Sequence, residues 1–318
     1  MKNLEFDIVK ESLPGEKFSQ LFQSNWSAYK AWYLDEGEQA RPTYMECIQA
    51  LQEHMPELYP VYRQILRAVE ADDLQSRFLS LYQPPPFYSG CSQLIYTKET
   101  PLLIRNYDFP PLLCEGVIFS SQWLKKVIAM TDCSWGALDG INEDGLAISL
   151  AYGGRLAQGD GFGVTLVLRY ILETCKVVDE AVEVLKRIPI HLDYNIAILD
   201  RLGGHANVEV APGHDTRVTT ARVSTNHQAD LESLSLPDSK IRMAALEEVL
   251  GTDISASAAV AHFLQPPLYR SHKVYQSGTL YTSVYSPESG TASYLWPHQR
   301  LDLSFENFNE TQLQIFYE

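Results

Sequence analysis

The proline run Pro84-Pro85-Pro86 divides the chain into two parts with different sequence patterns, and this division constrains the fold most. Before it, apolar residues recur at helical spacing over residues 44–55 and 58–68, and the first run begins behind Pro42-Thr43. After it, from residue 91 to about 150, short apolar runs of period two are broken by Gly, Pro, Asn and Asp. We therefore expect residues 1–90 to be helical and the following segment to form β-sheet.

The rest of the chain predicts blocks of strands and helices in place of a regular strand–helix alternation. Helices are expected at 164–175, 179–187, 239–250 and 255–264, and strands at 194–199, 206–210, 217–224, 280–285 and 292–296. Such blocks favour antiparallel sheet covered by helices over a parallel sheet. The pattern alone thus predicts a layered α+β sandwich.

The composition of the chain limits the kinds of partner that the protein can bind. The 318 residues are 45% hydrophobic and 20% charged, which is enough for a sizeable core. A net charge of -15 argues against nucleic acid or an anionic membrane surface as a partner, because both attract basic faces. The N-terminus lacks the basic and apolar regions of a signal peptide, and no apolar run approaches the ~20 residues that span a bilayer. We expect a cytoplasmic protein that does not enter membranes.

The cysteines point to one candidate nucleophile. They are five in number, widely spaced and without a Cys-x-x-Cys pair, so they indicate neither a disulfide framework nor a zinc site. The histidines also lack metal-ligand spacing, and we expect no metal and no cofactor. Cys91 alone has an informative context, because it follows Gly90 and opens a strand-like run.

That run is expected to form a β-hairpin that gathers charged groups around the thiol. Residues 91–96 and 102–104 alternate like strands, and residues 97–101 read as the turn between them. The hairpin would place Arg105 and Asp108 near Cys91, and a thiol beside a guanidinium and a carboxylate is a plausible nucleophile. The alternative is a surface ion pair between Arg105 and Asp108 that contributes little.

A cysteine nucleophile that breaks an amide needs a base. One candidate is a histidine, and His227 would be the partner in a papain-like pair, although we expect it to point to the opposite face of its strand. The other is the α-amine of Cys91 itself, released by cleavage after Gly90. The pKa of a free α-amine is about 8, close to working pH.

Several ordered blocks in residues 90–297 resemble the cysteine N-terminal-nucleophile (Ntn) hydrolases of the choloylglycine hydrolase and acyl-CoA:6-aminopenicillanic acid acyltransferase group. The blocks are Gly90-Cys-Ser, Arg105-Asn-Tyr-Asp108-Phe, Gly140-Ile-Asn-Glu-Asp-Gly-Leu-Ala147, Tyr194-Asn-Ile-Ala-Ile-Leu-Asp200 with Gly203 and Val208-Glu209, Thr225-Asn226-His227, and Ser239-x-x-Arg242. The resemblance implies a four-layer αββα sandwich of antiparallel sheets. It also implies a helical prosegment or small subunit at 1–90 and a catalytic domain at 91–318.

The resemblance implies roles for three residues of the first two blocks. Cys91 would be the nucleophile, and after cleavage at Gly90–Cys91 its own amine would be the base. Arg105 would lie beside the thiol and lower its pKa. Asp108 would hydrogen-bond the α-amine and hold it in place.

It also implies roles for three later residues. Asn226 would donate its side-chain amide to the oxyanion, although an asparagine after a strand is also an ordinary turn residue. Tyr152 falls where bile-salt enzymes carry asparagine and penicillin V acylases carry tyrosine, and its backbone amide would be the second donor. Arg242 resembles a later arginine of the family's catalytic set.

The implied activity is hydrolysis of a linear amide C–N bond through an acyl-thioester on Cys91. Transfer of the acyl group to an amine, and an uncleaved, catalytically silent binding protein of the same fold, are the alternatives. The partner would be a small N-acyl amide with an apolar acyl group, because apolar residues lie near the site blocks: Phe109, Leu112, Leu113, Phe119, Tyr152 and Phe162. The sequence leaves open whether the protein forms a homo-oligomer.

Overall fold

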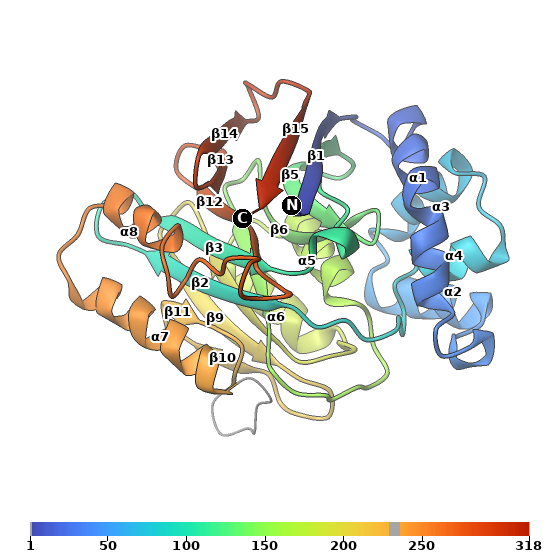
Figure 1. The fold of residues 1–318 in the computed structure, drawn as a ribbon. Coiled ribbons are helices and arrows are strands. Elements are labelled where there is room, and N and C mark those ends of the chain that lie inside the picture. The colour runs from blue at the N-terminus through green and yellow to red at the C-terminus, as the bar shows by residue number, and fades with distance from the viewer. Residues whose placement is uncertain (1, 229–235, 318) are drawn as a thin grey trace.

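The computed structural model describes residues 2–228 and 236–317. In this part of the chain the strands form two sheets that face one another, and helices cover both outer faces (Figure 1). The order of layers is helix, sheet, sheet, helix, and the pairing within the sheets is antiparallel except between β1 and β4. The predicted αββα sandwich is confirmed.

The larger sheet has nine strands among the described residues. Their order across the sheet is β10 (Arg217–Thr219), β9 (His205–Val210), β8 (Tyr194–Leu199), β7 (Ala147–Tyr152), β6 (Gly136–Asn142), β5 (Lys126–Asp132), β4 (Val117–Gln122), β1 (Lys2–Lys10) and β15 (Thr311–Tyr317). Its outer face packs against α5 (Val164–Thr174) and α6 (Val178–Arg187). Both helices begin and end within two residues of their predicted bounds.

The smaller sheet has six described strands and carries the predicted hairpin. Their order is β11 (Val223–Ser224), β2 (Gly90–Tyr96), β3 (Leu102–Asp108), β12 (Thr279–Ser286), β13 (Thr291–Trp296) and β14 (Gln299–Ser304). Helices α7 (Leu236–Gly251) and α8 (Ala256–Phe263) cover the side that carries β11, β2 and β3.

The pleat of β2 and β3 sorts their side chains between two cores. Cys91 and Ile95 belong to the core between the sheets, whereas Leu94 and Tyr96 belong to the core under α7 and α8. Alternation of successive side chains across a strand explains this division. It places the Cys91 thiol between the two sheets.

The segment before Cys91 differs from the purely helical prediction. It contains α1 (Glu16–Tyr33), α2 (Tyr44–His54), α3 (Tyr59–Ala68) and α4 (Asp73–Leu79), which form a helical cluster at one end of the sandwich (Figure 1). It also contains β1, and the expectation of helix is wrong there. Leu4, Phe6 and Ile8 alternate with polar residues along β1, a period of two that fits a strand. The boundary between residues 90 and 91 stays a prediction.

The predicted strand at 217–224 is wrong as one element. Its first half is β10, which pairs with β9 in the larger sheet, and its second half is β11, which pairs with β2 in the smaller sheet. The chain crosses between the sheets at 220–222, and the hydrophobic pattern of a single run cannot show such a crossing. In residues 2–228 and 236–317, no helix has both the length and the apolarity to cross a bilayer.

Candidate active site

The Cys91 thiol lies at the N-terminal end of β2, fully buried between the sheets. In the antiparallel pairing of β2 with β3, Cys91 is opposite Tyr107 and Gly90 is opposite Asp108. The guanidinium of Arg105 reaches the thiol from β3, and its Nη2 donates to Cys91 Sγ at 3.3 Å. Ser89 Oγ lies 3.9 Å from the same sulfur. The hairpin therefore brings Cys91 and Arg105 into contact, as expected.

Two opposed effects act on the pKa of the Cys91 thiol. Burial raises the pKa of Cys91, and the positive charge of Arg105 and its hydrogen bond oppose that rise. Arg105 thus acts in the expected direction, but in the uncut chain the pKa of the thiol is raised overall.

Arg105 belongs to a buried network that joins the sheets. Its Nη1 contacts the carboxylate of Asp139 on β6, and its Nε donates to the Leu150 carbonyl on β7 at 2.8 Å. Tyr281 donates to Asp139 Oδ2 at 2.7 Å. The Arg105 and Asp139 side chains have no exposed surface, so the alternative of a surface ion pair with Asp108 is excluded. A carboxylate inside an apolar strand was the signal for Asp139 that the sequence analysis missed.

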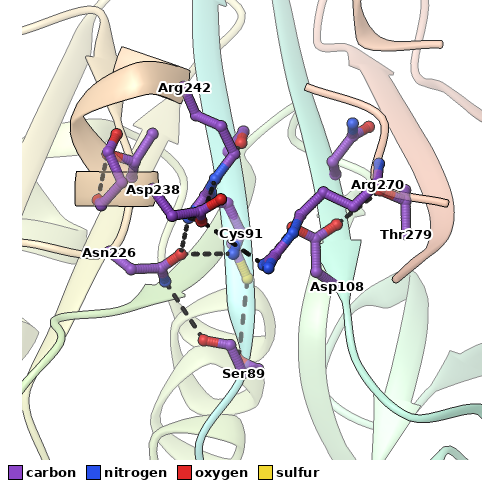
Figure 2. A network of polar contacts seen from close by, with 12 residues as sticks. Ser89, Cys91, Asp108, Asn226, Asp238, Arg242, Arg270 and Thr279 are labelled. Carbon is purple, nitrogen blue, oxygen red and sulfur yellow. Dashed lines mark hydrogen bonds and ion pairs between the residues drawn. The ribbon is translucent and has the colours of Figure 1, made fainter. Parts of the chain in front are cut away.

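The main chain of Cys91 is held by Asn226 and Arg242. Cys91 N donates to Asn226 Oδ1 at 2.9 Å, and Arg242 Nη2 donates to the same oxygen at 2.8 Å. Arg242 Nη1 contacts the Cys91 carbonyl and donates to Ser92 Oγ at 3.0 Å. Figure 2 shows these contacts converging on Cys91. Arg242, on α7, is therefore a direct neighbour of the candidate nucleophile.

Asn226 also links Cys91 to Tyr152 and Ser89. Its Nδ2 donates to the Tyr152 carbonyl at 2.9 Å and to the Ser89 carbonyl at 3.3 Å. A side-chain amide that already donates to carbonyl oxygens beside the thiol is placed to donate to an oxyanion. Tyr152 contacts this group through its carbonyl oxygen, and the roles of both residues as oxyanion donors stay predictions.

The Asp108 side chain lies on the face of β3 opposite to that of Arg105. Thr279 Oγ1 donates to Asp108 Oδ1 at 2.7 Å, and Arg270 Nη1 lies 3.7 Å from Oδ2. Oδ2 is buried and has no hydrogen-bond partner among the described residues. Burial raises the pKa of Asp108, and Arg242 and Arg270 oppose that rise. In the uncut chain the Cys91 amide donates to Asn226, so the predicted bond between Asp108 and a free amine concerns the cleaved form.

Sequence reasoning missed the residues that surround Asp108. Thr279 is the first residue of β12, Arg270 lies in the segment between α8 and β12, and Thr279 Oγ1 accepts from Arg270 N at 2.8 Å. Asp238 lies 3.1 Å from Arg242 Nη2 and 3.7 Å from Arg270 Nη1. No local pattern marks these residues, because they meet the site only through the packing of α7 and β12 on the hairpin.

His227 makes its polar contacts away from the thiol. Its Nδ1 lies 2.7 Å from Ser239 Oγ and 3.3 Å from Thr225 Oγ1. Cys91 Sγ contacts Arg105 and Ser89 instead. This geometry does not support the papain-like pair of Cys91 and His227.

A cavity of about 350 Å³ lies between α1 and the segment that follows β3. Its walls include Phe109, Leu112 and Leu113, three of the residues expected around an acyl group, and Trp32, Phe87 and Tyr88. The aromatic ring of Tyr88 also lies 5.0 Å from that of Tyr152. Phe119 and Phe162, which were expected in the same pocket, are core residues. Tyr88 therefore both lines the cavity and neighbours a residue of the Cys91 site.

The described part of the chain contains no cluster of three or more His, Cys, Asp or Glu side chains that fits a metal ion. Its five cysteines are free thiols.

Comparison with known families gives one match over most of the chain. The sequence profile described as acyl-coenzyme A:6-aminopenicillanic acid acyl-transferase matches residues 95–301. Arg105, Asp108, Tyr152, Asn226 and Arg242 lie within the matched range, and Cys91 lies just before it. No curated protein sequence matches the chain.

Solved structures with a similar arrangement share little sequence with this chain. A conjugated bile acid hydrolase from Clostridium perfringens has 15% identity and a TM-score of 0.46, over 72% of this chain and 97% of that one. A penicillin V acylase from Agrobacterium tumefaciens has 17% identity and a TM-score of 0.44, over 70% and 90%. A Caenorhabditis elegans N-acylethanolamine-hydrolyzing acid amidase ortholog has 13% identity and a TM-score of 0.43, over 63% and 93%.

Proposed function

Because the chain belongs to the acyl-coenzyme A:6-aminopenicillanic acid acyl-transferase family, we propose that it hydrolyses linear amides with Cys91 as an N-terminal nucleophile. The observation that carries the proposal is the setting of Cys91. Its thiol accepts a hydrogen bond from Arg105, its amide is held by Asn226, and the residue before it is a glycine. A buried thiol with fixed donors around it matches the needs of acyl transfer.

The first reaction is self-cleavage. Cys91 Sγ attacks the Gly90 carbonyl carbon, the C–N bond to Cys91 breaks, and the nitrogen takes up the thiol proton to become a free amine. Water then hydrolyses the Gly90 thioester, which leaves a carboxylate on Gly90 and a free thiol on Cys91. Arg105 stabilises the thiolate that forms at the start of the reaction.

The second reaction repeats this chemistry on a substrate amide. The Cys91 α-amine takes the thiol proton, Sγ attacks the acyl carbon, and the proton passes to the leaving amine as the C–N bond breaks. Asp108 holds the α-amine, Asn226 and the Tyr152 backbone amide donate to the oxyanion, and Arg242 positions Asn226. Water attack on the thioester releases the acid.

The cavity beside the site supports the proposed substrate class. Its apolar walls of Phe109, Leu112 and Leu113 suit an apolar acyl group, and residues 86–88, which shortly precede Cys91 in the chain, line the same cavity. The substrate would be a small N-acyl amide. Transfer of the acyl group to an amine acceptor is the second candidate, favoured by the family match, and the ratio of acid to new amide formed with a primary amine present would distinguish the two.

The experiment that tests the proposal is intact-mass spectrometry of freshly purified protein beside a Cys91→Ala variant. We expect two fragments split between Gly90 and Cys91 from the wild type, and a single chain of 35.9 kDa from the variant. A single chain from both would remove the α-amine from the mechanism and favour a silent binding protein. A cytoplasmic location and a homo-oligomeric state stay predictions.

A further inference from the structure

Gly90 shows how much space surrounds an acyl group at the nucleophile. In self-cleavage the acyl carbon that becomes bound to Cys91 Sγ is the Gly90 carbonyl carbon, so the α-carbon of that acyl group is Gly90 Cα. A substrate also forms a thioester with Cys91 Sγ. The residues packed around Gly90 Cα are therefore the residues that would face the α-carbon of a substrate acyl group.

These residues would crowd a branch at this carbon. A β-carbon added to Gly90 in the L configuration would lie 3.0 Å from both Arg270 Nη1 and Asp108 Cβ, and 3.2 Å from Asp108 Oδ2. Carbon atoms in ordinary contact are 3.5–4.0 Å apart. Glycine is favoured here by close approach, because a β-carbon would require Arg270 and Asp108 to shift by a few tenths of an ångström.

Several contacts hold Asp108 and Arg270 in place beside Gly90. Asp108 is part of β3, directly opposite Gly90, and accepts a hydrogen bond from Thr279. The main chain of Arg270 makes two hydrogen bonds with Thr279: its amide donates to the side-chain Oγ1, and its carbonyl accepts from Thr279 N, both at 2.8 Å. The Arg270 guanidinium lies over the Tyr275 ring, 4.1 Å from its centre. Asp108 Cβ cannot retreat without moving its strand.

We propose that Arg270 and Asp108 restrict the enzyme to acyl groups with an unbranched α-carbon. This inference rests on the proposed amidase or acyl-transfer function. The substrate class is then amides of acids with a methylene group next to the carbonyl. Amides whose acyl group carries an α-substituent in the L side-chain position, including L-aminoacyl groups other than glycyl, are then poor substrates.

The test compares p-nitroanilides of three acids with the purified, cleaved protein. Hexanoyl is the reference. The (R)-2-methylhexanoyl group places its methyl in the L side-chain position, and the 3-methylhexanoyl group adds the same carbon one position further out. Each kcat/KM is divided by the rate of alkaline hydrolysis of the same anilide, which removes intrinsic reactivity. We expect the corrected kcat/KM of the 2-methyl anilide to be roughly tenfold or more below that of the hexanoyl anilide. The corrected kcat/KM of the 3-methyl anilide should be comparable with that of the hexanoyl anilide.

A second set of measurements uses variants of Arg270 and Gly90. Arg270→Ser should raise the ratio of 2-methyl to unbranched turnover, while Arg300→Ser, at a half-exposed arginine on β14, should leave that ratio unchanged. Gly90→Ala should slow self-cleavage, and adding Arg270→Ser to it should restore part of the rate.

Equal turnover of hexanoyl and (R)-2-methylhexanoyl anilides would overturn the inference while leaving the proposed function intact. If none of the anilides is a substrate, the rate of self-cleavage tests the inference. Self-cleavage of Gly90→Ala at the wild-type rate would then overturn it. Absence of both anilide turnover and self-cleavage would overturn the proposed function and this inference with it.

Discussion

At the scale of single residues, Asn226 connects the parts of the site that come from distant segments. It accepts from Cys91 N and Arg242 and donates to the carbonyls of Tyr152 and Ser89. No other described side chain is hydrogen-bonded to both the Cys91 amide and the Ser89 carbonyl, which flank the proposed cleavage point.

We predict that Asn226→Ala slows self-cleavage by about 10²–10³-fold, the usual effect of removing one oxyanion donor. The measurement is the fraction of cleaved chain over time by mass spectrometry. Asn309→Ala is the matched control, because that asparagine is exposed and far from Cys91 in the chain. Cleavage of Asn226→Ala at the wild-type rate would contradict the assigned role.

A pair of carboxyl groups beside the cavity provides a pH-dependent test. Tyr29 OH contacts Glu115 and lies 3.2 Å from Asp132 Oδ1. Burial, and then the charge of Glu115, raise the pKa of Asp132 to about 7. A carboxyl group with a raised folded-state pKa stabilises the fold below its ordinary pKa, and this stability is lost as the pH rises through about 7.

We therefore predict that Asp132→Asn, which mimics the protonated acid, gains stability relative to its parent as the pH rises from 5 to 8.5. The measurement is the urea midpoint at both pH values in the Cys91→Ala background, where the chain stays uncut. Asp302→Asn, at an exposed aspartate, is the control. A difference between Asp132→Asn and parent that is the same at both pH values would refute the prediction.

At the scale of elements, β1 joins the predicted prosegment at residues 1–90 (the leader) to the predicted catalytic domain at residues 91–318. It pairs in parallel with β4 and antiparallel with β15, so it lies inside the larger sheet. Phe6 on β1 is fully buried, with its ring 5.0 Å from that of Trp296. A strand bonded on both sides would remain in place after a cut at residue 90, because its backbone partners are unchanged.

We predict that the two fragments produced by self-cleavage co-purify in native gel filtration and separate only in denaturant. Phe6→Ala should release the leader at a lower urea concentration, since such truncations cost about 3–5 kcal/mol in a core. Phe316→Ala on the adjacent β15 is the control, because Phe316 is 61% exposed. A leader that separates from the wild-type protein without denaturant would contradict this account.

At the scale of the whole molecule, one buried ion pair joins the two sheets at the site. Arg105 belongs to the smaller sheet and Asp139 to the larger one, and Tyr281 and Tyr285 also contact Asp139. The pair thereby couples the position of the guanidinium beside Cys91 to the packing of the sandwich.

We predict that Asp139→Ala destabilises the protein by about 3–5 kcal/mol, because Arg105 would be left buried without its counter-charge. Glu183→Ala, which breaks the exposed pair with Lys186, should cost at most about 1 kcal/mol. The measurement is chemical denaturation of both variants in the Cys91→Ala background. Similar effects from the two variants would show that the buried pair does not clamp the sheets.

The sequence by itself determined those features that depend on neighbours along the chain. Period-two runs on either side of a turn predicted the hairpin, and the pairing of Gly90 with Asp108 and of Cys91 with Tyr107 follows from it. Proline and capping residues located the helices: Thr43, expected near a helix start, caps α2. Resemblance in ordered motifs predicted the αββα layers and the residues that meet at Cys91.

Only the tertiary structure decided which side chains reach the site from outside those motifs. Arg270, Thr279 and Asp139 come from segments that the fold packs against the hairpin, and the sequence around them does not show that they meet near Cys91. The split of residues 217–224 between two sheets was likewise undetectable, because a run of apolar and polar residues does not state which sheet it joins. The net rise in the pKa of Cys91 depends on complete burial, and burial is a property of the packed molecule rather than of the residues beside the cysteine.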